Sequence, residues 1–551
     1  MTRLRLAPLV PLTALLVCGC SAPGGRSQAA ARASADTAAA REITGPALEG
    51  AIRLLSSDLF EGRGTGSRGD QLARAYIASE FERCGLRPAG DDGSFEQAVP
   101  ILGITTEVTA PLRARGAEGE AAFEAPTDYT AVAGNPAATA QWDDAELVFV
   151  GYGIDAPEQR WDDFGDALLR GKVLLVMNND PSTDPDLFAG RTRLYYGRWS
   201  YKYEEAARRG AVGAIVIHTT PSAGYPFQVI QGTHGRENFW LPFPDGEPQL
   251  PIRSWCSEDA ARRLCALGGH DLDALRQRAE SREFAPVPLG VTVSLGARNT
   301  VRELRSANVL GVLPGSDPAL ASEYVVVTAH FDHLGIGRER RGDEIYNGAL
   351  DNASGTAAML AIARACRALD PAPPRSLLFA AVTAEESGLL GSEWLAARLP
   401  FDKKQAIANY NIDGVGIWGP THDVEFIGHG KNSLTALAEE VAREHGRRLE
   451  PDGNTDLGLF YRSDHFNFAR IGVPAAYFKS GNDFVDRPED RRRMKASYTA
   501  THYHQPSDEL AGWWNFDGAV DDVRLIFDCL LRTAAGPAPT WTPGDEFEKL
   551  R

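Results

Sequence analysis

The chain has few cysteines, no excess of basic residues and only one short apolar run near its start. It carries 57 lysines and arginines against 74 aspartates and glutamates, a formal net charge of −17 at pH 7. Proteins that bind nucleic acids usually present a basic face, so this balance argues against a nucleic-acid partner. The apolar run, residues 6–17, is shorter than the roughly 20 residues that a permanent membrane-spanning helix needs.

The seven cysteines contain no Cys-x-x-Cys pair, which argues against a zinc site built from cysteines. Cys18 and Cys20 belong to the N-terminal segment, and the five others, an odd number, cannot all pair within one chain. Cys256 and Cys265 could form one bridge in an oxidising compartment. The alternative is a pair of buried thiols.

The first twenty residues have the pattern of an export signal. Arg3 and Arg5 precede the apolar run, which leads to Gly19 and Cys20. A small residue before a cysteine is similar to the lipobox of bacterial lipoproteins and predicts a lipid on Cys20; an ordinary cleaved secretory signal is the alternative. We expect an exported protein, either lipid-anchored in the cell envelope (periplasmic or cell-surface) or secreted, with no other membrane contact. Residues 21–44 lack apolar bulk and are predicted to form a flexible tether.

The length of 551 residues and the 43% hydrophobic content indicate a globular protein of more than one domain. From residue 300 onward, apolar strand-like runs alternate with helix-like segments. This pattern predicts an α/β fold with a largely parallel mixed sheet covered by helices on both faces. We predict one such domain from residues 45–115 and 296–540, with a second α/β unit, residues 116–295, inserted between its two parts.

Two other stretches of the chain carry little functional information. The loop at residues 64–69 fits GxGxxG, but a helix-like segment precedes it, whereas a dinucleotide-binding fingerprint requires a preceding strand. The insert, residues 116–295, shows no cluster of histidines with acids. We therefore expect the insert to be a binding or lid module.

Candidate metal ligands lie at or just beyond the strand-like runs of the second half, or in turns flanked by glycine or proline. They are His330, Asp351, Glu386, Asp413 and His504. Ligands gather at the carboxyl ends of parallel strands, and two imidazoles with three carboxylates can hold a pair of divalent metals. Each residue also has a structural alternative, such as a helix N-cap for Asp351.

Glu385 and Glu386 are adjacent acids at the end of an apolar run, where like charges repel unless cations neutralise them. A metal and a base would account for both: Glu386 as a ligand, and Glu385 as the group that takes a proton from water. The alternative is the solvated start of a helix. Asp332 lies two residues beyond His330, on the same side of the strand, and could fix the tautomer of that histidine.

The loop that contains His504 offers a competing ligand. His502 lies in the same loop, and Asp508 could orient either histidine.

The motifs AHFDHLG, ALDNASG, AEESGLLGS, NIDGVG, SDHFNFARIGVPA and YHQPSDE are similar, in this order, to those of the co-catalytic dizinc aminopeptidase family. That family includes bacterial leucine-type aminopeptidases, glutamate carboxypeptidase II and the catalytically inactive transferrin receptor. LFEGRGTGSRG resembles its N-terminal signature, so the resemblance covers residues 46–110 and 300–535. The stretch beginning ELVFVGYGIDAPEQRWDDF resembles the protease-associated domain that many members carry as an insert.

The resemblance implies a zinc-peptidase fold, two Zn²⁺ ions and a role for each matching residue. Asp351 would bridge the ions, His330 and Asp413 would complete one site, and Glu386 and His504 the other. Glu385 would be the general base, Asp332 the partner of His330, and Tyr503 a donor to the oxyanion. This chain departs from many members by having Asn352, rather than an acid, after the bridging aspartate.

These assignments predict an exported zinc metallopeptidase, and in particular an aminopeptidase acting on a peptide or aminoacyl substrate. An acidic centre would attract a free α-amino group. A glutamate-carboxypeptidase-like dipeptidase is an alternative that needs arginines in the pocket. Arg487 and residues 491–493 fall in a predicted loop and are interpreted as a solvated run, whereas Arg462 could bind a carboxylate or form a surface ion pair.

Two further alternatives predict a different set of ligands. A non-catalytic, receptor-like member would have lost metal ligands, and none is missing here. A single-zinc transferase similar to glutaminyl cyclase does not account for an intact set of Asp351, Glu385 and Glu386.

Overall fold

The computed structural model describes residues 38–550 except residues 186, 245 and 338–341. The predicted signal peptide with Cys20, and the predicted tether up to residue 37, lie outside the described residues. The end of that tether packs on the protein: Ala39 and Ile43 are fully buried, and Arg524 donates hydrogen bonds to the carbonyl oxygens of Ala40 and Ile43. Residues 38–44 are therefore not a tether, because their apolar side chains reach the core.

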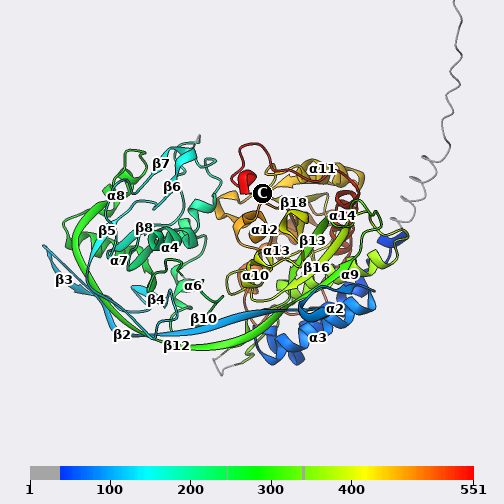
Figure 1. Cartoon of the computed structure of the whole chain (residues 1–551), viewed down its shortest axis with the longest axis horizontal. Coiled ribbons are helices and arrows are strands. Elements are labelled where there is room, and N and C mark those ends of the chain that lie inside the picture. The colour runs from blue at the N-terminus through cyan, green and yellow to red at the C-terminus, as the bar shows by residue number, and fades with distance from the viewer. Residues whose placement is uncertain (1–37, 186, 245, 338–341, 551) are drawn as a thin grey trace, which may run out of the picture.

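Two lobes lie side by side and share one continuous sheet (Figure 1). The strands of the larger lobe are β13 (Tyr324–His330), β16 (Ser376–Val382), β17 (Ala406–Asn411), β18 (Asp423–Ile427), β19 (Arg448–Pro451) and β20 (Ala475–Ser480). Those of the smaller lobe are β4 (Tyr129–Ala133), β5 (Thr139–Phe149), β8 (Val173–Met177), β9 (Gly213–His218) and β11 (Ile252–Ser257).

The centre of the larger lobe is parallel. Strand β13 runs parallel to both β16 and β17, and β17 runs parallel to β20. Strands β12 (Val287–Leu313) and β18 add antiparallel neighbours on either side of this group. The predicted largely parallel, mixed α/β sheet is confirmed.

Helices cover both faces of this sheet. They are α2 (Gly45–Leu55), α3 (Arg68–Arg83), α9 (Ser354–Arg367), α10 (Leu390–Ala397), α11 (Leu434–Glu444), α12 (His465–Arg470), α13 (Pro488–Thr501) and α14 (Asp517–Ala535). Val325 and Val327 of β13 pack into the core that contains α9 and α14. Val326, between them, packs on the opposite face with residues of α10 and α12. A strand buried on both faces is apolar at most positions, which explains the nearly continuous apolar runs.

The smaller lobe repeats this arrangement on a smaller scale. Strands β5, β8, β9 and β11 are parallel. Helices α7 (Glu258–Leu267) and α8 (Leu272–Ala279) cover one face and α4 (Trp199–Arg208) the other; α5 (Thr220–Ala223) and α6 (Phe227–Gln231) complete the lobe. Its likeness to a protease-associated domain stays a prediction.

Two long strands join the lobes along one edge (Figure 1). They are β2 (Glu96–Gly116) and β12 (Val287–Leu313), which pair antiparallel over most of their length. Strand β10 (Glu237–Trp240) adds to β2 where it passes between the lobes. The predicted boundary at residue 295 thus falls inside a strand, so a paired ribbon rather than a flexible linker connects the two lobes.

Two expectations concern single features of the chain. The five cysteines that the structure describes are free, buried thiols, in agreement with the alternative for Cys256 and Cys265. Among the helices of the described ranges, none combines the length and the apolar character that crossing a bilayer requires.

Candidate metal centre

Three neighbouring parallel strands bring four of the predicted side chains to one edge of the sheet. His330 is the last residue of β13, Glu385 and Glu386 follow the end of β16, and Asp413 follows the end of β17. These strands lie in the order β17-β13-β16. Because the carboxyl ends of parallel strands meet at the same edge, the side chains converge there.

Asp351 lies in the tight turn η5 (Ala349–Ala353) before α9, and its peptide bond to Asn352 is cis. The Asn352 side chain is fully buried. Its amide nitrogen donates to the carbonyl oxygens of His330 and Ile412, and its amide oxygen accepts from the backbone N–H of Gly414. The residue that departs from the family pattern therefore ties the Asp351 turn to the ends of β13 and β17.

The two carboxylate oxygens of Asp351 face two different sets of donors. Oδ1 lies 3.3 Å from Nε2 of His330, which is in turn 3.6 Å from Oδ1 of Asp413. Oδ2 lies 3.1 Å from Nε2 of His504, which is 3.0 Å from Oε2 of Glu386. The four other predicted ligands thus gather around Asp351, two on each side.

This donor set fits zinc. Ligand atoms at about 2.0–2.2 Å from a tetrahedral ion lie roughly 3.4 Å from one another, close to the separations around Asp351. Nitrogen and carboxylate oxygen are donors that zinc accepts. His330 with Asp351 and Glu386 forms one group whose ligand atoms lie within 4.8 Å of one another, and His330 with Glu385 and Asp413 forms a second. The second group places Glu385 beside the centre.

The backbone of Glu385 is anchored by a hydrogen bond, and charged groups surround its side chain. Its N–H donates to Oδ1 of Asp332 at 3.1 Å. Burial raises the pKa of the Glu385 carboxyl well above its ordinary value, and the neighbouring carboxylates of Glu386 and Asp464 act in the same direction, opposed by His330. A buried carboxyl among other acids favours its protonated form, so Glu385 is suited to accept and hold a proton.

Asp332 acts on the acidic pair as well as on His330. Its backbone carbonyl oxygen lies 3.3 Å from Nδ1 of His330, whereas its carboxylate is 3.8 Å from that nitrogen. The carboxylate instead accepts from the backbone N–H groups of Glu385 and Glu386. The structure therefore places Asp332 mainly as an anchor for these two glutamates.

The loop of His504 separates the two rival histidines. Nδ1 of His502 faces Ser507, at 2.9 Å from its carbonyl oxygen and 2.8 Å from its hydroxyl, whereas Nε2 of His504 lies against Asp351 and Glu386. Tyr503 is half exposed, and its ring stacks on that of His504 with centroids 3.9 Å apart.

Asp508 orients neither histidine. Its carboxylate accepts from the backbone N–H groups of Leu350 and Asp351, at 2.9 and 3.0 Å, and from the hydroxyl of Tyr498. It therefore fixes the backbone of the Asp351 turn.

Two residues at the centre were not predicted from the sequence. Arg63, fully buried, donates to the carbonyl oxygens of Phe331, Asn347 and Gly348, all in segments that carry the ligands, and also to Leu55. The second is His333, whose Nδ1 lies 2.7 Å from Oε1 of Glu386.

Neither residue has a strong signal in the sequence. His333 lies in the same AHFDHLG motif as His330, and its position there is the one indication that it belongs to the centre. Arg63 lies in the glycine loop, where nothing in the sequence distinguishes it from Arg68.

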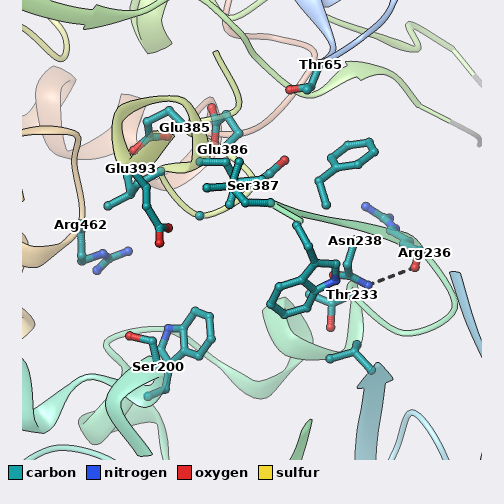
Figure 2. A pocket seen from close by; sticks show the side chains of 18 of the residues that line it. Thr65, Ser200, Thr233, Arg236, Asn238, Glu385, Glu386, Ser387, Glu393 and Arg462 are labelled. Carbon is teal, nitrogen blue, oxygen red and sulfur yellow. Dashed lines mark hydrogen bonds between the residues drawn. The ribbon is translucent and has the colours of Figure 1, made fainter. Parts of the chain in front are cut away.

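A cleft of about 2300 Å³ opens between the lobes at this centre. The larger lobe contributes Glu385, Glu386, Tyr503 and His504 to its lining, and the smaller lobe contributes aromatic and basic side chains. In Figure 2, Glu385 and Glu386 lie on the opposite side of the cavity from Ser200 of the smaller lobe. Both lobes therefore form the walls of one site.

Eight arginines line this cleft, and three of them act on one another: Arg193 and Arg198 of the smaller lobe and Arg462 of the larger. Burial, and then the charge of Arg462, lower the pKa of Arg198 to about 10, against the opposing effect of nearby acids such as Glu385. Burial also lowers the pKa of Arg193, and Arg462 adds to this effect. The three positive charges therefore lie close together and near the acidic centre.

Of the arginines expected in a loop, residues 491–493 are on helix α13 instead, and Arg487 directly precedes it. Arg492 pairs with Glu489, and Arg493 with Asp490, each one turn apart on the exposed surface, in agreement with a solvated run. Arg491 differs, because its side chain is 12% exposed and donates to the carbonyl oxygen of Trp418. None of the four lines the cleft.

Comparison with known proteins shows which peptidases the chain is similar to. Residues 308–521 match the model of Peptidase family M28. Leupeptin-inactivating enzyme 1 of Streptomyces exfoliatus is 30% identical over 252 residues, which cover 44% of this chain and 51% of that protein. A probable glutamate carboxypeptidase of Arthroderma benhamiae is 28% identical over 301 residues, 49% of this chain and 39% of that protein.

The fold likeness extends over nearly the whole chain. The aminopeptidase from Aneurinibacillus sp. strain AM-1 superposes with a TM-score of 0.50 at 22% identity, covering 91% of this chain and 96% of that one. The chain spans about half or less of the length of the curated relatives that it matches. The predicted resemblance to the zinc aminopeptidase family and the predicted zinc-peptidase fold are confirmed.

Proposed function

We propose that this chain, with its M28-type region, is a zinc-dependent aminopeptidase that binds two Zn²⁺ ions. One observation carries the proposal: the two oxygens of Asp351 face separate pairs of ligands, at 3.3 Å from His330 on one side and 3.1 Å from His504 on the other. A carboxylate placed between two such pairs of ligands is best explained by the binding of two cations, one on each side.

The chain supplies a complete set of ligands. His330, Asp413 and Asp351 would hold one ion, and Glu386, His504 and Asp351 the other. When bound, paired zinc ions lower the pKa of a water molecule towards neutrality and polarise the carbonyl group of the substrate.

Glu385 moves the protons. Its carboxylate takes a proton from the attacking water, and then delivers that proton to the nitrogen of the leaving amine. Its burial favours the protonated form between these steps. The Tyr503 hydroxyl, on the ring that stacks on His504, donates a hydrogen bond to the oxyanion that develops on the substrate carbonyl.

The charge of the centre bears on the end of the substrate. The carboxylates of Asp351, Glu385, Glu386 and Asp413 offset the four positive charges that two Zn²⁺ ions would bring, so the centre does not repel the protonated α-amino group of a peptide. This is compatible with cleavage of the N-terminal peptide bond, the activity for which the aminopeptidase of similar fold is named. We also propose that the protein is exported, with Cys20 as its lipid attachment site, and that the smaller lobe is a protease-associated domain.

The test of the mechanism is the substitution Glu385→Gln in the full-length protein. We expect the variant to retain two zincs per chain, because the proposed ligand set does not include Glu385, and to lose turnover by about 10²–10⁴-fold, as for loss of a general base. Glu393→Gln is the matched control, since Glu393 also lines the cleft (Figure 2) but lies outside both ligand groups. Turnover of Glu385→Gln close to that of the control would remove Glu385 from this role.

A second candidate function is supported by the arginines of the cleft. Arg193, Arg198 and Arg462 could bind the carboxylate of a short peptide, as a carboxypeptidase or dipeptidase requires. A panel of two substrate types separates the candidates: aminoacyl anilides with a free amine and no carboxylate, and N-acylated dipeptides with a free carboxylate. We expect hydrolysis of the first type, and hydrolysis of only the second would establish the carboxypeptidase.

A further inference from the structure

We propose that His333 is a positioning residue that presents one oxygen of Glu386 to the metal. The inference rests on the proposed function, because it assigns His333 to the zinc site formed by Glu386 and His504. His333 touches neither the substrate nor the reacting atoms in this account. It acts through a metal ligand.

The contact between His333 and Glu386 engages only one oxygen of the Glu386 carboxylate. Nδ1 of His333 lies 2.7 Å from Oε1, and the other oxygen, Oε2, lies 3.0 Å from Nε2 of His504. The His333 side chain is fully buried and that of Glu386 is 6% exposed. Glu386 is therefore held by one oxygen, which leaves the other directed towards the zinc site.

The ring of His333 has little freedom to turn. A Cβ atom at Gly348 would lie 2.5 Å from its Cγ and 2.6 Å from its Cδ2, so only a glycine there leaves space for the imidazole. On another side the ring meets that of His504 edge-on, with centroids 5.6 Å apart. The backbone N–H of His333 is also bound, to the carbonyl oxygen of Arg63. Packing and backbone together fix the direction of Nδ1.

The two ring nitrogens have different surroundings. A carboxylate oxygen can only accept, so Nδ1 carries the hydrogen and donates to Glu386. Nε2 is buried and has no hydrogen-bond partner among the described residues. The neutral ring with its hydrogen on Nδ1 is the form that meets both conditions, since Nε2 then has no N–H group left without an acceptor.

This arrangement predicts an effect on one zinc site and not on the other. Residues that hold a ligand from behind contribute about 10–100-fold to metal affinity. Among the described residues, His333 has a polar contact with Glu386 and a ring contact with His504. It has no such contact with His330 or Asp413. Removal of its side chain should weaken one zinc site by about 10–100-fold and leave the other unchanged.

The experiment compares three substitutions of His333 in the metal-free, full-length protein, titrated with zinc against a chelator. His333→Ala removes the donor. In His333→Asn the amide nitrogen can take the place of Nδ1, whereas in His333→Gln it lies near the position of Nε2. We expect the weaker site to lose about 10–100-fold in affinity in the Ala and Gln variants and to stay near the parent value in the Asn variant.

Four further results complete the test. Because the loss is one of affinity, added zinc should restore turnover to the Ala and Gln variants. Equal weakening of both sites in all three variants, together with a lower melting temperature of the metal-free protein, would show a purely structural role and overturn the inference. Parent-like affinity at both sites in the Ala and Gln variants would also overturn it while leaving the proposed function intact, whereas a parent protein that binds fewer than two zincs would overturn the proposed function itself.

Discussion

At the scale of single residues, Arg63 shows how the centre tolerates so many acids. Its side chain is fully buried, and burial lowers its pKa to about 10, while the charges of Asp508, Asp332, Asp351 and Glu386 raise it. The guanidinium keeps its charge at neutral pH and donates to four backbone carbonyl oxygens. Arg63 therefore both offsets the negative charge and joins the loops around the metal ligands.

Replacement of Arg63 by leucine should strongly destabilise the protein. It would leave buried carbonyl groups without donors and acids without a nearby cation, and loss of one partner of a buried charge typically costs about 3–5 kcal/mol. We expect a fall of this size in the free energy of unfolding, measured by chemical denaturation. Arg68→Leu is the control, because that side chain is 66% exposed, and a surface change of this kind usually stays within about 0.5 kcal/mol. Equal losses in the two variants would contradict the role of Arg63.

The sequence predicted the candidate ligands but not the residues that hold them. Two histidines and three acids of suitable chemistry at strand ends can be found from apolar runs alone. Arg63 could not be found, because its acceptors are carbonyl oxygens up to 285 positions away, and every residue type has such an oxygen. His333 was missed because alternation along a strand directs attention to Asp332, two residues after His330, rather than to the third residue.

At the scale of elements, apolar content decided what could be predicted. Strands β13 and β16 are buried at nearly every position, so their apolar runs identified them. Strands β2 and β12 alternate buried and exposed residues, and their length could not be read because they pass from one lobe to the other. Helix α13 buries Tyr498 and no other residue, so it lacks the apolar stripe by which a helix is recognised.

Helix α12 begins with a histidine that is unusual for its surroundings. His465 is fully buried between the rings of Phe460 and Tyr477, with centroids 4.7 and 5.0 Å away. Neither of its ring nitrogens has a hydrogen-bond partner among the described residues. Burial lowers the pKa of His465 to about 3, so the folded protein keeps this ring neutral.

The stability of the protein should therefore fall in acid partly through His465. In the unfolded chain His465 has a pKa of about 6.5 and binds a proton below that pH. In the folded protein the same ring stays neutral until about pH 3. The contribution of neutral His465 to the free energy of unfolding is fully present above pH 6.5. It is lost as the pH falls towards 3, by up to about 1.4 kcal/mol per pH unit.

His465→Leu removes this titration, and denaturant unfolding of the variant and the parent at two pH values measures it. Between pH 6.5 and pH 5 we expect the parent to lose about 2 kcal/mol more than the variant. Other groups titrate equally in both proteins and cancel in the comparison. Identical losses would show that His465 takes up its proton over the same pH range in the folded protein as in the unfolded chain, and would contradict the lowered pKa.

At the scale of the whole molecule, the lobes are joined at two places. Strands β2 and β12 connect them along one edge. Elsewhere the Tyr195 ring of the smaller lobe packs on Phe466 of the larger, with centroids 5.2 Å apart, and the N–H of Arg193 donates to the carbonyl oxygen of Thr455. The smaller lobe is thus held against the larger lobe by these contacts and forms one wall of the cleft.

The size of the cleft bears on the substrate. At about 2300 Å³ it exceeds the roughly 300–1000 Å³ of ordinary small-molecule pockets. With the acidic centre on one wall and aromatic and basic side chains on the other, the cleft has space for several residues of an extended peptide. The proposed aminopeptidase would therefore hold its substrate with both lobes.

The claim on which this account depends is that Asp351 lies between two metal ions. Crystals of the zinc-loaded protein, measured on both sides of the zinc absorption edge, test it directly by locating the anomalous scatterers. We predict two peaks on opposite sides of the Asp351 carboxylate, one beside His330 and Asp413 and the other beside Glu386 and His504. A single peak, or two peaks of which either lies away from Asp351, would contradict the account.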